Sequence, residues 1–335
     1  MNTDVELENS TGSESPAKRH EFLWLKDGNV VLGTNVYLFK VHKSVLSMHS
    51  SVFRDMFELP TEEDLDMGSS DIGAVGMAPE LYEGVHFVSL SDDGREMEHI
   101  LRAVYERGYY DPHSDEGTLE KFTALLRLSC KYDFSVIRKD VLGHLSRLYP
   151  TYLEDYDNAA KAYLEIFGNP RSICHLPLLK AAAEAGIDDH FPSLYYASSG
   201  SRVIPILNIF LKSPSHYPTM HRLIDGQQSL GKAIQDLMGA FIMLTERCIC
   251  VHMNQYHPDI FDGEEIPEVF CTHNLVGLSS ESLFSKKFPL RACNLCKESF
   301  SRRIEEEREA IWEAIPSFYR FNKTWDEIRA ELPTQ

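Results

Sequence analysis

The chain has 335 residues, 43% hydrophobic and 25% charged, which is ordinary for a globular protein and enough for two domains. Its 33 basic and 51 acidic residues leave a formal net charge of −18, which opposes binding to nucleic acid or to an anionic membrane. No apolar run approaches the roughly 20 residues that span a bilayer, and residues 1–20 lack the apolar core of a signal peptide. We therefore expect a cytoplasmic or nuclear protein whose seven cysteines stay reduced.

The chain opens with a polar tail and a set of short strands. Residues 1–20 are too poor in apolar side chains to repay the entropy of ordering, so we expect disorder there. Strands and turns then alternate, with strands at 22–25, 29–32 and 36–41 and turns at 27–28 and 33–35. The strand at 36–41 is apolar on both faces, which is typical of a strand held between two layers.

A helical hairpin is predicted directly after this strand. Apolar side chains recur at helical spacing from Val45 to Phe57, and Ser50 and Ser51 can cap a second helix within that stretch. Residues 58–84 are acidic and aperiodic, so we predict a flexible surface insertion there. An unselected insertion is favoured over a regulatory one because loops tolerate length cheaply.

The pattern resumes after the insertion. A strand is predicted at 85–90, followed by a helix that residues 91–93 can cap, with an apolar stripe from Met97 to Tyr105. Further helices are predicted at 119–130 and 137–148, and Pro150 ends the domain.

Three short motifs carry a family resemblance: Asp27-Gly-Asn-Val-Val-Leu32, Phe39-x-x-His42-Lys43-x-x-Leu46 and Ser51-x-Val-Phe53-x-x-Met56-Phe57. In order and spacing they resemble the BTB/POZ domain, and in particular the variant common in basidiomycete fungi. The resemblance implies an α+β fold in which a small sheet is clasped by helices, here over residues 21–149. The signature residues are Asp27, Phe39, His42, Lys43, Leu46 and Phe53.

Residues 150–335 are predicted to form a mainly helical C-terminal domain. Helical stripes occur at 156–167, 178–185, 204–211, 232–250 and 300–315, and Gly186 is placed as a helix C-cap. In the last helix, Arg302, Arg303 and residues 305–309 are assigned to the solvent face. Trp312 and Trp325 are expected to pack this helix against its neighbours.

The sequence contains no enzyme constellation. It lacks a glycine-rich phosphate loop, a nucleophile elbow and a His-Glu-x-x-His helix, so we do not expect an enzyme. At His42, a buried histidine bonded to backbone is favoured over a catalytic base. Asp27 is interpreted as a turn residue. The BTB resemblance implies the alternative, a role near a dimer interface.

The resemblance also implies a partner-binding surface. BTB domains associate through their first helix and a flanking strand, which places Ser44 and Met48 in such a surface and implies a homodimer or a second BTB protein as partner. Tyr109 and Tyr110 could anchor a partner or pack inside the domain, and the sequence does not separate these alternatives. Tyr105 is expected to be buried.

One cysteine pattern suggests a metal. Cys271-x-His273 precedes Cys293-x-x-Cys296, and Cys248 and Cys250 lie upstream. We predict a structural zinc site formed by Cys271, Cys293 and Cys296, with Cys248, Cys250 or His273 as the fourth ligand. The alternative is a set of small buried thiols.

These patterns together favour a protein–protein interaction module. The family resemblance implies self-association or partner recruitment, and an adaptor for a cullin-type ubiquitin ligase is one alternative. A second alternative is a metal- or redox-responsive protein that uses the C-terminal cysteines.

Overall fold

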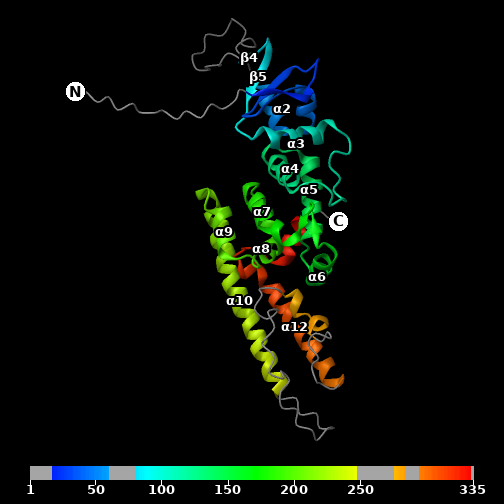
Figure 1. Ribbon diagram of the computed structural model, residues 1–335, viewed down its shortest axis with the longest axis vertical. Helices are drawn as coiled ribbons and strands as arrows, with labels where there is room; N and C mark the ends of the chain where they lie inside the picture. The colour runs from blue at the N-terminus through cyan, green and yellow to red at the C-terminus, as the bar shows by residue number, and fades with distance from the viewer. Residues whose placement is uncertain (1–16, 60–79, 247–274, 284–293, 333–335) are drawn as a thin grey trace, which may run out of the picture. The chain divides into compact units, whose positions relative to one another are not determined.

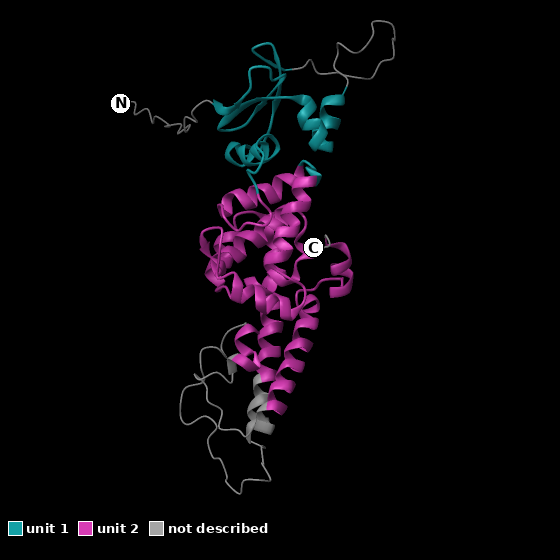
Figure 2. Cartoon of the chain, turned by 90° about the vertical axis from the view of Figure 1, so that its right-hand side faces the viewer, with its two compact units in different colours: residues 1–110, 132–135 teal, residues 111–131, 136–335 magenta. Residues whose placement is uncertain are grey.

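The structure is a computed structural model, and it describes residues 17–59, 80–246, 275–283 and 294–332 (Figure 1). The chain divides into two compact units, which Figure 2 shows in teal and magenta. Unit 1 comprises residues 1–110 and 132–135, and unit 2 comprises residues 111–131 and 136–335.

Unit 1 combines a five-stranded sheet with helices, in the strand order β1-β3-β2-β5-β4. Strands β2 and β3 form an antiparallel hairpin, β5 lies parallel to β2, and β1 lies parallel to β3. The elements of unit 1 are β1 (Lys18–Trp24), β2 (Val30–Gly33), β3 (Tyr37–Val41), α1 (Lys43–His49), α2 (Ser51–Glu58), β4 (Leu81–Tyr82), β5 (Val85–Ser89) and α3 (Gly94–Tyr105).

The core of unit 1 lies at the central strands, as the apolar pattern predicted. Val30, Val31 and Leu32 on β2 are buried, and so are Phe39 and Val41 on β3. A strand buried on both faces must lie between two layers, which is why both its odd and even positions are apolar. The predicted α+β class, with helices beside a small mixed sheet, is therefore confirmed.

The predicted cap between the first two helices is also confirmed. Ser50 has an extended backbone, and its hydroxyl accepts a hydrogen bond from the backbone N–H of Phe53 at 3.0 Å. The same hydroxyl donates to the carbonyl of Tyr132 at 2.5 Å. Ser50 therefore starts α2 and also ties it to the segment 132–135 that returns to unit 1.

Two predictions for unit 1 were wrong at their edges. β1 begins at Lys18, inside the stretch predicted to be disordered, because Lys18 and Arg19 pair with β3. β4 lies inside the predicted insertion and pairs with β5. A two-residue strand leaves no sequence period, so the pattern did not reveal it. Residues 1–16 and 60–79, which cover most of the predicted tail and insertion, lie outside the described residues.

The rest of the described chain is mainly helical, as predicted. Its elements are α4 (Leu119–Lys131), α5 (Ser135–Leu148), α6 (Leu153–Ala162), β6 (Glu165–Ile166), β7 (Asn169–Pro170), α7 (Arg171–Glu184), α8 (Pro192–Ser198), α9 (Val203–Phe210), α10 (Tyr217–Glu246), α11 (Ser280–Leu283), α12 (Asn294–Phe318) and α13 (Trp325–Glu331), with short 3-10 turns at Asp188–His190, Pro214–His216 and Val276–Leu278. Helices α10 and α12 pack side by side (Figure 1).

The boundary between the two compact units lies at residue 110, with residues 132–135 returning to unit 1, and not at the predicted residue 149. Helix α4 packs against α7, so it belongs to the same compact unit as the C-terminal helices. Packing between segments far apart in sequence leaves no mark on local periodicity. The extent of a BTB domain over residues 21–149 remains a prediction.

Several helices differ from their predicted limits, among them α7, which begins at Arg171 and not at residue 178. The helix predicted at 156–167 ends at Ala162, and Phe167 and Gly168 adopt positive φ values of 53° and 68° in the turn between β6 and β7. Two successive left-handed residues make a tight hairpin turn instead of a helix end. The helix predicted from residue 232 begins at Tyr217, because a proline in the first turn, here Pro218, does not interrupt a helix.

The last long helix has the predicted apolar face, with one error on the opposite side. Phe300, Ile304, Ile311 and Ile315 are buried, as expected. Arg308, which was assigned to solvent, is only 2% exposed. It is held by the carboxylates of Asp157, at 2.6 Å, and of Glu305, and it also donates to the carbonyl of Leu275.

The predicted tryptophan packing is confirmed. Trp312 and Trp325 stack with ring centroids 5.4 Å apart and planes 9° apart. Each indole N–H donates to a backbone carbonyl, Trp312 to Thr151 and Trp325 to Trp312. These bonds satisfy the polar end of each buried indole and join α13 to α12.

Candidate interaction surface

The beginning of α1 holds a small polar cluster formed by Asp27, His42 and Tyr105. The Nε2 atom of His42 lies 3.3 Å from the carboxylate of Asp27, and its Nδ1 atom lies 3.4 Å from the hydroxyl of Tyr105. The backbone N–H of His42 donates to the same hydroxyl at 2.9 Å. Nε2 is thus placed to donate to the carboxylate of Asp27, and Nδ1 to accept from the hydroxyl of Tyr105.

Hydrogen bonding and burial shift the pKa values of Asp27 and Tyr105 in this cluster. The pKa of Asp27 lies below its usual value because the carboxylate accepts hydrogen bonds from its own backbone N–H and from His42. Burial raises the pKa of the Tyr105 hydroxyl, which therefore stays protonated. Asp27 thus remains ionised at the surface, close to the start of α1.

The cluster corrects two expectations. His42 was expected to bond to backbone, but its ring contacts two side chains, because the turn before β2 and the end of α3 both reach it. Tyr105 was expected to be buried, but it is only half-buried at the last residue of α3. Neither contact was visible in the sequence because the three residues are far apart along the chain.

The remaining signature residues have structural positions. Phe39, Leu46 and Phe53 are buried, and the Phe53 ring stacks on Tyr132 with centroids 4.8 Å apart. Lys43 lies at the first residue of α1, where its backbone N–H donates to the side-chain oxygen of Asn29 at 2.8 Å. These residues hold α1 and α2 in place, and they leave the outer side of α1 to its exposed residues.

That outer side carries the residues expected to contact a partner. Ser44 and Met48, which lie one helical turn apart on α1, are both exposed, and Met48 has 73% of its surface accessible. Phe22 on β1, one of the two edge strands of the sheet, is 64% exposed. An exposed methionine and an exposed phenylalanine are apolar groups that a partner protein can cover.

The side chain of Tyr109 contacts other residues of its own unit. Its hydroxyl lies 2.6 Å from the Nδ1 atom of His99, and the guanidinium of Arg102 lies 4.5 Å from its ring centroid. Arg102 is held in turn by Glu106 through paired bonds of 2.8 and 2.9 Å. Tyr109 and Tyr110 are both half-buried. For Tyr109, these contacts favour the packing alternative.

Sequence reasoning missed His20, which shapes β1. Its Nδ1 atom accepts hydrogen bonds from the backbone N–H groups of Phe22 and Leu23, and β1 loses its register with β3 between Arg19 and Trp24. The bulge turns Leu23 into the core and leaves Phe22 exposed. A bulge breaks the period of two, so the sequence marked only residues 22–25 as a strand and missed the beginning of β1 at Lys18.

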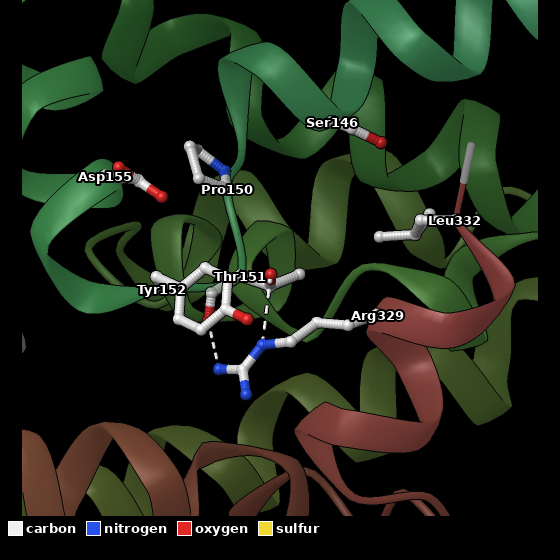
Figure 3. A pocket seen from close by; sticks show the side chains of 7 residues that line it. All are labelled: Ser146, Pro150, Thr151, Tyr152, Asp155, Arg329 and Leu332. Carbon is white, nitrogen blue, oxygen red and sulfur yellow. Dashed lines mark hydrogen bonds between the residues drawn. The ribbon is translucent and has the colours of Figure 1, made fainter. Parts of the chain in front are cut away.

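Unit 2 contains a half-open cavity of about 280 Å³ beside the α5–α6 connection (Figure 3). It is lined by Ser146, Pro150, Thr151, Tyr152, Asp155, Arg329 and Leu332. The Arg329 guanidinium stacks 3.9 Å from the Tyr152 ring centroid and donates to the carbonyl of Thr151 and to Asp326. These contacts of Arg329 join α13 to the α5–α6 connection. Because the polar groups that line the cavity bond to one another, we assign no ligand to it.

The predicted zinc ligands fall where the structure gives no geometry. Cys248, Cys250, Cys271, His273 and Cys293 lie outside the described residues, and the side chain of Cys296, in α12, is not described either. Within the described ranges, no group of three or more His, Cys, Asp or Glu side chains is placed to hold a metal ion.

Comparison with known protein families decides the class of unit 1. A BTB/POZ domain is found at residues 27–77. BTB domains are protein–protein interaction modules, and the matched stretch contains the Asp27–His42 pair, α1 and α2. No curated protein and no solved structure matches the chain. The resemblance to the basidiomycete variant therefore remains a prediction.

In the part of the chain that is described, no helix is long and apolar enough to cross a membrane.

Proposed function

We propose that the chain is an interaction protein whose BTB domain self-associates through α1 and β1. The observation that carries this proposal is the exposure of Met48 on the outer side of α1, while Leu46 on the same helix is buried. A helix that buries one side against its own domain and exposes a large apolar side chain on the other is suited to an isologous contact.

Asp27 supports the same surface. It is exposed and ionised beside the start of α1, and His42 holds its carboxylate in a defined position. A charge fixed beside an apolar contact sets the register of two subunits more than it adds affinity. In this proposal Met48 and Phe22 provide the apolar contact, and Asp27 selects one arrangement of the two domains.

Sedimentation velocity of the full chain at about 50 µM, well above the dissociation constant of a specific dimer, tests the proposal. We expect a dimer that Met48→Glu converts to a monomer without lowering the melting temperature. Leu164→Glu, at an exposed leucine of unit 2, is the matched control and should leave the dimer intact. A wild-type monomer at this concentration would contradict self-association.

Recruitment of another protein is the alternative role for the same surface. A second BTB protein or a cullin scaffold would then occupy α1. Binding of a purified cullin N-terminal domain, weakened by Met48→Glu and unchanged by Leu164→Glu, would favour the ubiquitin-ligase adaptor over a homodimer. Retention of wild-type affinity by Met48→Glu would argue against this surface as the adaptor site.

The zinc site remains a separate proposal that rests on the cysteine spacing alone. Metal analysis of the purified wild-type chain and of the variants Cys293→Ser and Cys296→Ser measures the zinc content directly. About one zinc per chain, lost in both variants, is the expected result for a closed site. Placement of the protein in the cytoplasm or the nucleus also remains a prediction.

A further inference from the structure

Helix α9 in unit 2 has an exposed apolar face. Its sequence, Val203–Phe210, contains no charged residue, and only Asn208 is polar. Ile206 and Phe210 are buried and hold the helix to its neighbours α7 and α10. Val203 and Ile204 are nevertheless 58% and 70% exposed, and Leu211, directly after the helix, is 49% exposed. The helix is thus apolar on a side that nothing in the described chain covers.

The exposed residues, together with half-buried Leu207, form one continuous stripe. At about 100° per residue, Val203, Leu207, Leu211 and Ile204 fall within roughly 100° of one another around the helix axis. Leu211 keeps a helical backbone (φ −74°, ψ −9°), so the stripe continues past the last helical residue. With a rise of 1.5 Å per residue, it is about 12 Å long. Two turns of apolar surface are sufficient to receive the apolar face of one partner helix.

Two cations border this stripe. Arg202 precedes the helix, Lys212 follows Leu211, and both side chains are exposed. Neither has an ion-pair partner among the residues that the structure describes. In a chain of net charge −18, cations that remain unpaired at both ends of an apolar helix face complement carboxylates on a partner.

We propose that the exposed face of α9 (Val203, Ile204, Leu207 and Leu211), together with Arg202 and Lys212, binds an acidic amphipathic helix of a partner protein. Apolar side chains of that helix at i, i+4 and i+7 lie along the stripe, and its carboxylates pair with the two cations. This surface lies in unit 2 and is distinct from the α1 surface of the BTB domain.

Charge excludes the competing occupants of this face. If two copies paired through α9 in an antiparallel, twofold arrangement, Arg202 of each copy would face Lys212 of the other, and like charges in contact destabilise such a pair. An anionic membrane would be repelled by the net charge of −18. An acidic helix places opposite charges beside Arg202 and Lys212, and because it is short it comes close to this face and not to the rest of the acidic surface.

Fluorescence anisotropy with the full chain and a labelled designed peptide tests the proposal. The peptide is helical, with leucine at i, i+4 and i+7 and glutamate at the flanking positions. A control peptide keeps the leucines and carries lysine in place of glutamate. We expect the glutamate peptide to bind at least tenfold more tightly than the lysine peptide, because two charge pairs are replaced by repulsion.

Variants separate the apolar from the charged contribution. Ile204→Ser should weaken binding of the glutamate peptide about tenfold, because Ile204 is the most exposed apolar residue of the stripe. The double variant Arg202→Glu/Lys212→Glu should reverse the preference between the two peptides. Leu164→Ser, at an exposed site away from α9 in sequence, should change neither affinity. All the altered side chains are exposed, so melting temperatures should stay within a few degrees.

Several results would overturn the proposal. They are equal binding of both peptides, full affinity in Ile204→Ser, and no binding of the glutamate peptide at millimolar concentration. A dimer that dissociates in Ile204→Ser would identify a second copy as the occupant. Co-sedimentation with phosphatidylserine vesicles that is lost in Arg202→Glu/Lys212→Glu would identify a membrane surface instead.

Discussion

The ring of Tyr319 occupies the space where any side chain on Gly226 would begin. A Cβ atom on Gly226 would lie 1.9 Å from the Cδ1 atom of Tyr319, far inside van der Waals contact. Tyr319 is fully buried, and its hydroxyl lies 2.5 Å from the Oγ atom of Ser199. The contact between α10 and Tyr319, which directly follows α12, therefore depends on a glycine inside a 30-residue helix.

Gly226→Ala should destabilise the protein although alanine is the better helix former. Alanine gains up to about 1 kcal/mol in helix propensity, but forcing an atom into a filled core costs about 1–3 kcal/mol or more. We expect a net loss of at least about 1 kcal/mol in the free energy of unfolding, measured by urea denaturation. Gly143 in α5 has no atom within 4 Å of its missing Cβ, so Gly143→Ala should be neutral or stabilising. Equal effects of the two substitutions would contradict this account.

Arg308 should be among the most sensitive charged residues of unit 2. Arg308→Leu leaves Asp157, only 15% exposed, without its ion-pair partner at 2.6 Å. Breaking a buried pair in this way typically costs about 3–5 kcal/mol. Arg303→Leu, at an exposed site on the same helix, should cost less than about 0.5 kcal/mol. The double variant Arg308→Leu/Asp157→Leu should recover part of the loss. A fully additive result would show that the two residues are not coupled.

His175 should make the protein less stable in mild acid. Burial, together with the nearby positive charge of Arg171, lowers the pKa of His175 from 6.5 to about 3. Between these values the unfolded chain binds a proton that the folded chain does not. The free energy of unfolding therefore falls as the pH drops from about 6.5 towards 3.

The variant His175→Gln isolates this contribution. Glutamine does not titrate and can still accept the hydrogen bond from the Tyr149 hydroxyl, which lies 2.8 Å from the Nδ1 atom of His175. We expect a shallower dependence of the unfolding free energy on pH between 6 and 4, measured by urea denaturation at each pH. His144, whose pKa burial also lowers, is unchanged in both proteins and cancels in the comparison. Identical slopes would show that His175 takes up its proton equally in the folded and unfolded states.

A feature was predicted correctly when it depends on residues close together in the sequence, and it was missed when it depends on residues far apart. The Ser50 cap was predictable because a serine before an apolar helical stripe acts on the backbone three residues ahead. The α12 stripe was predictable because its buried face repeats with the helical period, and β2 because a strand buried on both faces is a continuous apolar run. For the candidate surface, Ser44 and Met48 lie on the predicted helix, and their exposure is compatible with a partner contact that remains to be tested.

The sequence by itself determined most of the longer helices and of the strands, the α+β class of unit 1 and the BTB motifs, because these depend on neighbours within a few turns. Only the tertiary structure decided that Arg308 is buried, that His42 bonds to Asp27 and Tyr105, and that Gly226 must accommodate Tyr319. Each of these contacts joins segments distant in the chain. Their geometry depends on how whole elements pack, and no local period of the sequence records that packing.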